Sequence, residues 1–204
     1  MAALTMTELL AVPALKRTLE PALQKALDGK AKPPGALGRI EALALTLGLI
    51  QGRVRPAIEC PVLLVFAGDH GMTRSGVAAF PSSVTVAMVD TLLAGKASAN
   101  AFARVVGAEV RVIDAGVAAD LSDRAGLVQA KIAFGTADAS IEPAMTPQQA
   151  EAALLAGASV AQQAIAEGAD LIALGEMGIG NSASAALLMH RLAPASLDDC
   201  VGQG

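Results

Sequence analysis

The sequence of 204 residues contains no tryptophan, no tyrosine and four phenylalanines, and only 17% of its residues are charged. Its 15 basic and 19 acidic residues give a formal net charge of −4. A protein that binds nucleic acid through a basic surface and stacking aromatic side chains is therefore not expected. An intrinsically disordered chain is excluded, because such chains are polar and charged, whereas 53% of these residues are hydrophobic.

Long apolar runs and paired cysteines are also missing. Mean hydropathy is +0.52, but apolar runs such as 43–50 and 61–67 are much shorter than the roughly 18 residues that span a bilayer. No basic segment followed by an apolar one begins the chain, so no secretion signal is expected. Cys60 and Cys200 lack C-x-x-C spacing, which favours a reducing compartment. We therefore expect a cytoplasmic protein without a membrane segment.

The shortage of charge also bears on assembly. Soluble domains usually have about 25% charged residues, and a chain with 17% cannot cover an isolated globule with charged side chains. Either its sheet is buried on both faces, or part of its surface is covered by another chain or by further sequence. We expect a homo-oligomer.

Strand and helix patterns alternate along most of the chain. The predicted strands are 61–67, 109–114, 127–133 and 170–174, and the predicted helices are 83–94, 97–106, 147–167 and 182–191. The continuous apolar run 61–67 is typical of a strand buried on both faces. Thr146, Pro147 and Gln149 form the pattern of a capped helix start. The alternation predicts an α/β fold with a doubly wound, mostly parallel sheet.

The two ends of the chain differ from its middle. Leucines at helical spacing predict a helix over 6–28, interrupted by two prolines, and a rigid turn within 32–41 begins a second helix that runs to about residue 51. We expect residues 1–55 to form the helical part of a small domain and residues 56–204 to form a large domain. Because the last residues are a glycine-rich loop, we expect the large domain to be truncated at its C-terminus.

Ligands of parallel sheets bind beyond the carboxyl ends of the strands. Three unusual loops follow predicted strands, at 68–71, 115–117 and 175–182. In the last loop, closely spaced glycines allow a tight turn with exposed amides, and Asn181 or Ser182 can cap the next helix. Such amides can bind a phosphate, although a glycine-rich turn that packs a helix against a strand has the same pattern.

Acidic and histidine side chains also follow these strands. Glu176 either pairs with a ligand group, acts as a general base with a raised pKa, or accepts amide hydrogen bonds and braces its loop. Asp69 and His70 leave two interpretations open: a functional pair or metal ligand, and the structural role that we favour, in which Asp69 fixes loop amides and His70 donates to a backbone carbonyl. His190 is the second of two histidines, so no metal site is predicted.

Several motifs, in a fixed order, closely resemble one family. They are KPPGALGRIE at 32–41, FAGDHG at 66–71, FPSSVT at 80–85 followed by Met88 and Val89, Gly135-Thr136, the segment 143–146, and GEMGIGN at 175–181. Together they resemble the nicotinate-nucleotide–dimethylbenzimidazole phosphoribosyltransferases. The resemblance extends from about residue 30 to the last residue.

The resemblance implies a homodimer with a Rossmann-like large domain, and a small domain built from both chain ends. It implies transfer of 5-phosphoribosyl from nicotinate mononucleotide to 5,6-dimethylbenzimidazole, giving α-ribazole 5′-phosphate and nicotinate in cobalamin biosynthesis, with no cofactor and no metal. The implied substrate-binding residues are Gly175, Gly178, Ile179, Gly180 and Asn181, with Glu176 at the mononucleotide, and Phe80, Ser82 and Ser83 near the acceptor base.

Departures from the family pattern leave an alternative open. Ala87 stands where the family usually has a glutamine, and Ala36 where it usually has a serine. Family members are longer, and their usual catalytic glutamate lies beyond residue 204. We therefore expect an N-terminal portion that is inactive or weak unless Glu176 acts as the base. The alternative is a non-catalytic module that binds a mononucleotide or a benzimidazole, or a dimerising fragment. A nicotinamide-dependent oxidoreductase is disfavoured because the GxGxxG motif is missing.

Overall fold

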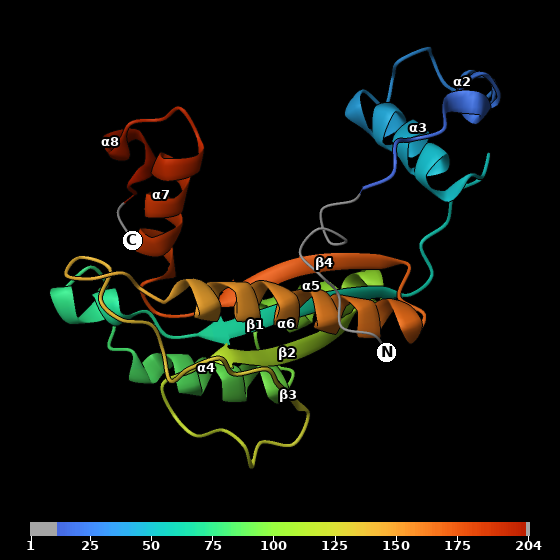
Figure 1. Cartoon of the computed structure of the whole chain (residues 1–204). Helices are drawn as coiled ribbons and strands as arrows, with labels where there is room; N and C mark the ends of the chain where they lie inside the picture. The colour runs from blue at the N-terminus through green and yellow to red at the C-terminus, as the bar shows by residue number, and fades with distance from the viewer. Residues whose placement is uncertain (1–11, 203–204) are drawn as a thin grey trace. The chain divides into compact units, whose positions relative to one another are not determined.

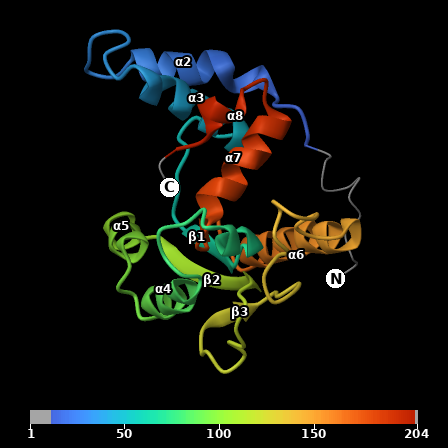
Figure 2. The same ribbon diagram turned by 90° about the vertical axis from the view of Figure 1, so that its left-hand side faces the viewer.

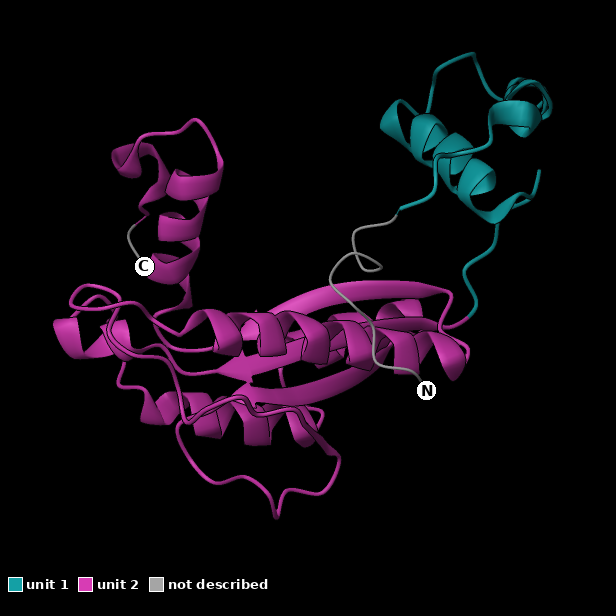
Figure 3. Cartoon of the chain, viewed as in Figure 1, with its two compact units in different colours: residues 1–59 teal, residues 60–204 magenta. Residues whose placement is uncertain are grey.

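The computed structural model describes residues 12–202. Contacts within the chain divide it into two units, residues 1–59 and 60–204 (Figure 3). The division falls close to residue 55, where the sequence suggests a boundary. Within residues 12–202, no helix combines the length and the hydropathy that a membrane span requires.

The first unit is helical. Its elements are a 3-10 turn η1 (Arg17–Leu19), α2 (Glu20–Asp28) and α3 (Arg39–Gln51). Proline lacks an N–H group and fits only the first turn of a helix, so Pro21 fixes the start of α2. The helix expected over 6–28 is therefore wrong for residues 12–16, which are not helical, and its residues 6–11 lie outside the described residues.

The turn before α3 is held by an ion pair. Lys32 Nζ lies 2.8 Å from Glu41 Oε1, which also accepts the N–H of Leu37 (3.1 Å). The KPPGALGRIE motif thus builds a turn within this unit.

The second unit contains a four-stranded sheet. Its elements are β1 (Pro61–Gly68), η2 (Gly71–Ser75), α4 (Ser83–Leu93), α5 (Ser98–Val106), β2 (Glu109–Gly116), β3 (Leu127–Gln129), α6 (Pro147–Ala166), β4 (Leu171–Met177), α7 (Asn181–Leu192) and α8 (Leu197–Cys200). All pairs are parallel, and the strand order is β3-β2-β1-β4. Because β4 lies on the opposite side of β1 from β2, the winding reverses between β1 and β4. The predicted doubly wound, Rossmann-like α/β fold is confirmed.

Helices cover both faces of the sheet, with α4 and α5 on one side and α6 on the other (Figure 2). The side chains of β1 alternate between these faces. Val65 and Ala67 pack with α4, whereas Val62 and Leu64 pack with α6, and all four are at most 4% exposed. The expectation that 61–67 is buried on both faces is therefore confirmed.

The edge strand β4 differs from β1. It pairs with β1 on one side, and the side chain of Leu174 is 76% exposed. Helix α7 projects from the carboxyl end of β4 (Figure 1), and its Leu188, Met189 and Leu192 are exposed as well. Part of the exposed apolar surface therefore lies at this edge, and other exposed apolar residues lie on α3, α5 and α6.

Two local expectations need correction. The strand expected over 127–133 ends at Gln129; beyond it, Ile132 N–H donates to Ala115 O at the end of β2, and Lys131 Nζ donates to Ala119 O in the loop after β2. The short helix α8 was not expected after the break at 193–196; Ser196 caps it by accepting the N–H of Asp199 (3.2 Å).

Candidate functional site

A cavity of about 590 Å³ lies at the carboxyl edge of the sheet. It is lined by the ends of β1, β2 and β4, by loop residues between 132 and 146, and by the first turns of α6 and α7. The winding reverses between β1 and β4, so the cavity occupies the position where doubly wound sheets bind ligands. Of the residues expected in the site, Asp69, His70, Glu176 and Asn181 line it.

Glu176 is the last residue but one of β4 and is exposed, and Asn181 Nδ2 donates to its Oε1. The prediction that Glu176 acts as a general base assumed that its carboxylate lies in apolar, poorly solvated surroundings. Glu176 is exposed, so that assumption is wrong. Asn181 Oδ1 also accepts the N–H of Ser182 (2.8 Å), so Asn181 links Glu176 to the first turn of α7. The arrangement leaves Glu176 at the cavity, held by one side-chain amide.

Two glycines allow the loop after β4 to pass very close to β1. A Cβ at Gly178 would lie 1.9 Å from Gly68 O, so a larger residue could not occupy this position without backbone movement. Gly180 has φ +89°, a left-handed conformation that favours glycine. Close packing of a helix start on a strand end, one of the two interpretations of this loop, is therefore present.

The amides of this loop are largely engaged by protein acceptors. Ile179 N–H donates to Thr85 Oγ1 (3.2 Å), and Asn181 N–H donates to Gly178 O (3.1 Å). Gly175, Gly178, Ile179 and Gly180 do not line the cavity. Of the loop amides proposed to bind a phosphate, only those of Gly178 and Gly180 are left without a protein acceptor described above. Phosphate binding at this loop stays a prediction.

His70 packs against the same loop. Its Nδ1 lies 2.8 Å from Ser184 Oγ in the first turn of α7, a side-chain partner in place of the backbone carbonyl that the structural interpretation expected. Burial lowers the pKa of His70 below 6.5, and the fields of Glu176 and Asp69 partly oppose this shift. His70 therefore fastens α7 to the end of β1 as a neutral imidazole at neutral pH.

Asp69 fixes the loop after β2, as the structural interpretation expected. Its Oδ2 accepts the N–H of Ala118 (2.8 Å), and its own N–H donates to Gly116 O (2.9 Å). Its Oδ1 is buried and has no hydrogen-bond partner among residues 12–202.

The sequence analysis did not single out the buried carboxylate at the end of β2. Asp114 is 0% exposed; its Oδ1 accepts the N–H groups of Gly116 (3.1 Å) and Val117 (2.9 Å), and its Oδ2 lies 2.8 Å from Lys131 Nζ. Lys131 also donates to the carbonyl oxygens of Val117 and Ala119. This ion pair joins the carboxyl end of β2 to residue 131 and so fixes the segment between them. The apolar pattern of the strand did not predict the ion pair.

The segment expected near the acceptor base lies outside the cavity. Phe80 is 65% exposed, and neither it nor Ser82 nor Ser83 lines the cavity. Thr85, in the first turn of α4, is fully buried, and its Oγ1 accepts the Ile179 N–H. The segment thus meets the glycine loop through Thr85, which the sequence analysis named only as part of a motif.

Comparisons with known proteins agree with this arrangement. A family model described as phosphoribosyltransferase matches residues 12–204. The chain belongs to this family. The resemblance found in the sequence is confirmed at this level.

Named relatives of this phosphoribosyltransferase chain are considerably longer. The nicotinate-nucleotide–dimethylbenzimidazole phosphoribosyltransferase of Cupriavidus taiwanensis is 49% identical over 193 residues, which are 95% of this chain and 56% of the relative. That of Aromatoleum aromaticum is 52% identical over 186 residues, which are 91% and 54% of the two chains. The crystal structure of CobT from Thermus thermophilus has a TM-score of 0.87 at 44% identity, and covers 91% of this chain and 56% of its own. The chain spans about half the length of these relatives.

Several residues that line the cavity were missed as site residues by the sequence analysis. They come from the loop before α6 and from α6 and α7: Thr136, Met145, Thr146, Gln149, Ser184 and Leu188. The capping box predicted at the start of α6 is confirmed, with Gln149 N–H donating to Thr146 Oγ1 (3.1 Å) and Thr146 N–H to Gln149 Oε1 (2.8 Å). Its position beside the cavity could not be read from the pattern. Ser184 could have been predicted from one feature of the sequence: it lies one helical turn after Asn181 and therefore on the same face of α7.

Proposed function

We propose that this chain forms part of an enzyme that transfers 5-phosphoribosyl from nicotinate mononucleotide to 5,6-dimethylbenzimidazole, giving α-ribazole 5′-phosphate and nicotinate in cobalamin biosynthesis. The observation that carries the proposal is a cavity at the winding reversal, lined by Glu176 and Asn181 of the GEMGIGN motif, in a chain that belongs to this family. The names of its relatives support the substrates.

The chemistry asks little of ionisable groups. Nicotinate leaves from a cationic pyridinium and needs no proton, while positive charge develops on the ribose as the bond breaks. The protein must align the two substrates, anchor the phosphate and accept the proton of the benzimidazole N–H. Asn181 and the His70–Ser184 pair position the donor side of the cavity. Phe80, Ser82 and Ser83 contact the acceptor base in the assembled enzyme.

We place the principal base outside these 204 residues, as the family resemblance implies. Glu176 is the carboxylate of the GEMGIGN loop that lines the cavity, and it is exposed and bonded to Asn181. Without the principal base, turnover by this chain is expected to fall by about a hundredfold or more relative to a complete relative.

The test follows nicotinate release by chromatography after mixing both substrates with the chain, with the Thermus thermophilus relative as positive control. Calorimetry measures nicotinate mononucleotide binding to the same sample. Binding with release at least about a hundredfold slower than the relative supports the proposal. Release at the rate of the relative would contradict the assignment of the base. Absence of nicotinate mononucleotide binding would contradict the function itself.

We also propose that the chain acts in the cytoplasm as a homodimer. The exposed side chains of Leu174, Leu188, Met189 and Leu192 support an interface at the β4 edge, since large exposed apolar patches mark interaction sites. Sedimentation velocity of the wild type and of an L188E/L192E variant tests it. A monomeric wild type would contradict the dimer.

The second candidate function is a non-catalytic module, which Ala87 favours. It would be supported if the chain binds nicotinate mononucleotide but releases no nicotinate, even when the C-terminal half of a complete relative is added.

A further inference from the structure

One wall of the cavity is a loop that closes on itself. This wall loop comprises residues 137–144, and Ala137 N–H donates to Ala144 O (2.8 Å) across its base. Residues 142–144 of the loop line the cavity. The wall loop itself contains neither helix nor strand, so its position depends on its contacts with neighbouring elements.

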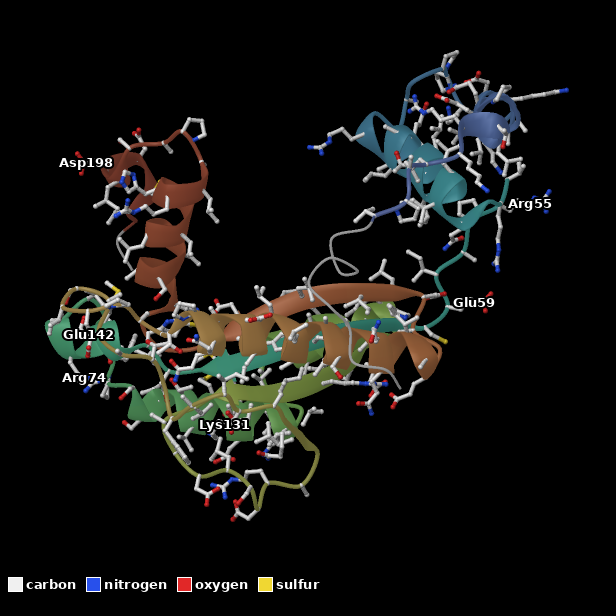
Figure 4. The ribbon with its side chains drawn as sticks, in the orientation of Figure 1. Arg55, Glu59, Arg74, Lys131, Glu142 and Asp198 are labelled. Atoms are coloured by element: carbon white, nitrogen blue, oxygen red, sulfur yellow. The ribbon has the colours of Figure 1, made fainter. Side chains whose placement is uncertain are left out.

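A buried carboxylate joins the wall loop to η2. Asp138 is 7% exposed, and its Oδ2 accepts the hydroxyl of Ser75, the last residue of η2 (2.6 Å). Its Oδ1 accepts both the hydroxyl (2.6 Å) and the N–H (3.0 Å) of Ser140. Figure 4 labels Arg74 of η2 and Glu142 of the wall loop at the same end of the unit. Asp138 therefore attaches the wall loop to η2 and also fixes the turn within the loop.

This cluster of Asp138, Ser75 and Ser140 lies behind the wall and does not contact a ligand itself. None of the three residues lines the cavity, whereas Glu142, whose N–H donates to Asp138 O (3.0 Å), does. Hydrogen bonds from the Ser140 and Ser75 hydroxyls lower the pKa of Asp138 below 3.8, so at neutral pH its side chain only accepts hydrogen bonds. Both hydroxyls then donate to the same carboxylate, which fixes the direction of every bond in the cluster.

We propose that Asp138 is a positioning residue, which holds the wall loop against η2 in the conformation that binds nicotinate mononucleotide. The inference rests on the proposed function and adds to it a residue outside the cavity. A ligand binds more tightly when the groups around it are already held in place, because less conformational entropy is lost on binding. Without the Asp138 side chain the ligand itself must order the wall loop, and affinity falls.

The experiment compares two replacements of Asp138 in the 204-residue chain. D138A removes every side-chain acceptor of the cluster, and calorimetry should show nicotinate mononucleotide binding about tenfold more weakly. D138N keeps one oxygen for Ser140 and places an amide group opposite Ser75, whose hydroxyl can then donate to Ser140 Oγ at 3.0 Å. Its affinity should stay within about twofold of the wild type, because asparagine both donates and accepts.

A second variant tests whether Ser75 and Asp138 act as one link. S75A should also weaken binding. The double variant D138A/S75A should bind no more weakly than D138A, because each single change already breaks the same connection.

D120A is the matched control. Asp120 forms the same local turn as Asp138, since its Oδ1 accepts the N–H of Ser122 (3.0 Å). It lies in the segment 117–126, which does not line the cavity. D120A should therefore leave the affinity for nicotinate mononucleotide unchanged.

Two measurements distinguish positioning from a purely structural role. Far-UV circular dichroism should show D138A as folded as the wild type under the binding conditions, because Gly71 N–H still donates to Thr136 Oγ1 (3.1 Å) and holds the start of the wall loop. Hydrogen exchange should be faster in D138A at the amides of Ile141 and Glu142. If D138A does not fold, S75A decides, and unchanged affinity in S75A would overturn the inference.

The outcomes separate this inference from the proposed function. Equal affinity of the wild type and D138A, an equal loss in D120A, or a loss in D138N as large as in D138A would overturn the role of Asp138 and leave the function standing. If D138A binds more weakly as expected but a complete relative releases no nicotinate with the two proposed substrates, the inference stands and the function fails. If the wild type binds no nicotinate mononucleotide, both are wrong.

Discussion

Asp114 and Glu176 lie near the carboxyl ends of the two strands that flank β1, yet their environments are opposite. Asp114 is fully buried, and it is bonded to two backbone amides and to the Lys131 ammonium group. Glu176 is exposed at the cavity and accepts one amide of Asn181. The same kind of residue at the same edge of the sheet therefore serves folding in one place and is available to a ligand in the other. Five predictions test this division, in decreasing order of their consequences for stability.

The buried ion pair should carry the greatest stabilisation. In D114N the Lys131 ammonium group loses its counter-charge in a buried site, and the free energy of unfolding should fall by about 3–5 kcal/mol. Denaturant unfolding followed by far-UV circular dichroism measures this, since the chain has no tryptophan or tyrosine for fluorescence. D90N removes one of the two acidic partners of Arg124 in an exposed cluster, where Asp123 remains, and should cost about 0–1 kcal/mol. Equal losses in the two variants would remove the distinction.

Packing rather than charge holds the loop after β4. G178A places a Cβ 1.9 Å from Gly68 O, so the loop or β1 must shift, at a cost of about 1–3 kcal/mol. G157A is the matched control, because no atom lies within 4 Å of its added Cβ in α6, and it should be neutral or stabilising by up to about 1 kcal/mol. A neutral G178A would show that the close approach is not required.

Thr85 connects α4 to the same loop. T85V keeps the volume of a fully buried side chain but removes the acceptor of the Ile179 amide, which should cost about 1 kcal/mol. Hydrogen exchange should show the Ile179 amide exchanging faster in the variant. T91V, whose parent hydroxyl donates to Ala87 O within α4, should change stability by less than about 0.5 kcal/mol.

The His70 contact predicts a dependence of stability on pH. Burial lowers the pKa of His70 in the folded chain below 6.5, so the unfolded chain takes up the proton first as the pH falls. Its contribution to stability is complete above pH 6.5 and decreases as the pH falls through the folded pKa. The unfolding free energies of wild type and H70Q at pH 7.5 and pH 5 should differ most at the higher pH. A proton titration of the two imidazole resonances, assigned with H70Q, should give His70 a pKa below 6.5; a higher value would contradict the prediction.

The least change in stability is expected at Glu176. E176Q changes an exposed side chain with one hydrogen bond, so the free energy of unfolding should change by less than about 0.5 kcal/mol, while D114N is strongly destabilised. The comparison would fail if E176Q lowered stability as much as D114N does.

The sheet was largely predictable from short-range patterns. Continuous apolar residues located β1, the Thr146–Gln149 pattern located the start of α6, and the alternation of elements predicted a parallel sheet. The end of β3 at Gln129 was missed because the apolar pattern continues past it, and the helix α8 was missed because it is four residues long and begins at the cap Ser196. In the site, Glu176 and Asn181 were found from their loop, whereas Ser184 and Asp114 were not, since their partners lie far away in the sequence.

The local sequence was enough to predict most of the strands and helices and the glycine-rich loop after β4. Strands, helices and tight turns depend on local backbone preferences and on the periodicity of apolar residues. Which carboxylate is buried and which faces the cavity was settled only when the strands packed together. Burial depends on the strand order and on the approach of Lys131 and α7, and neither is encoded in the few residues around Asp114 or Glu176.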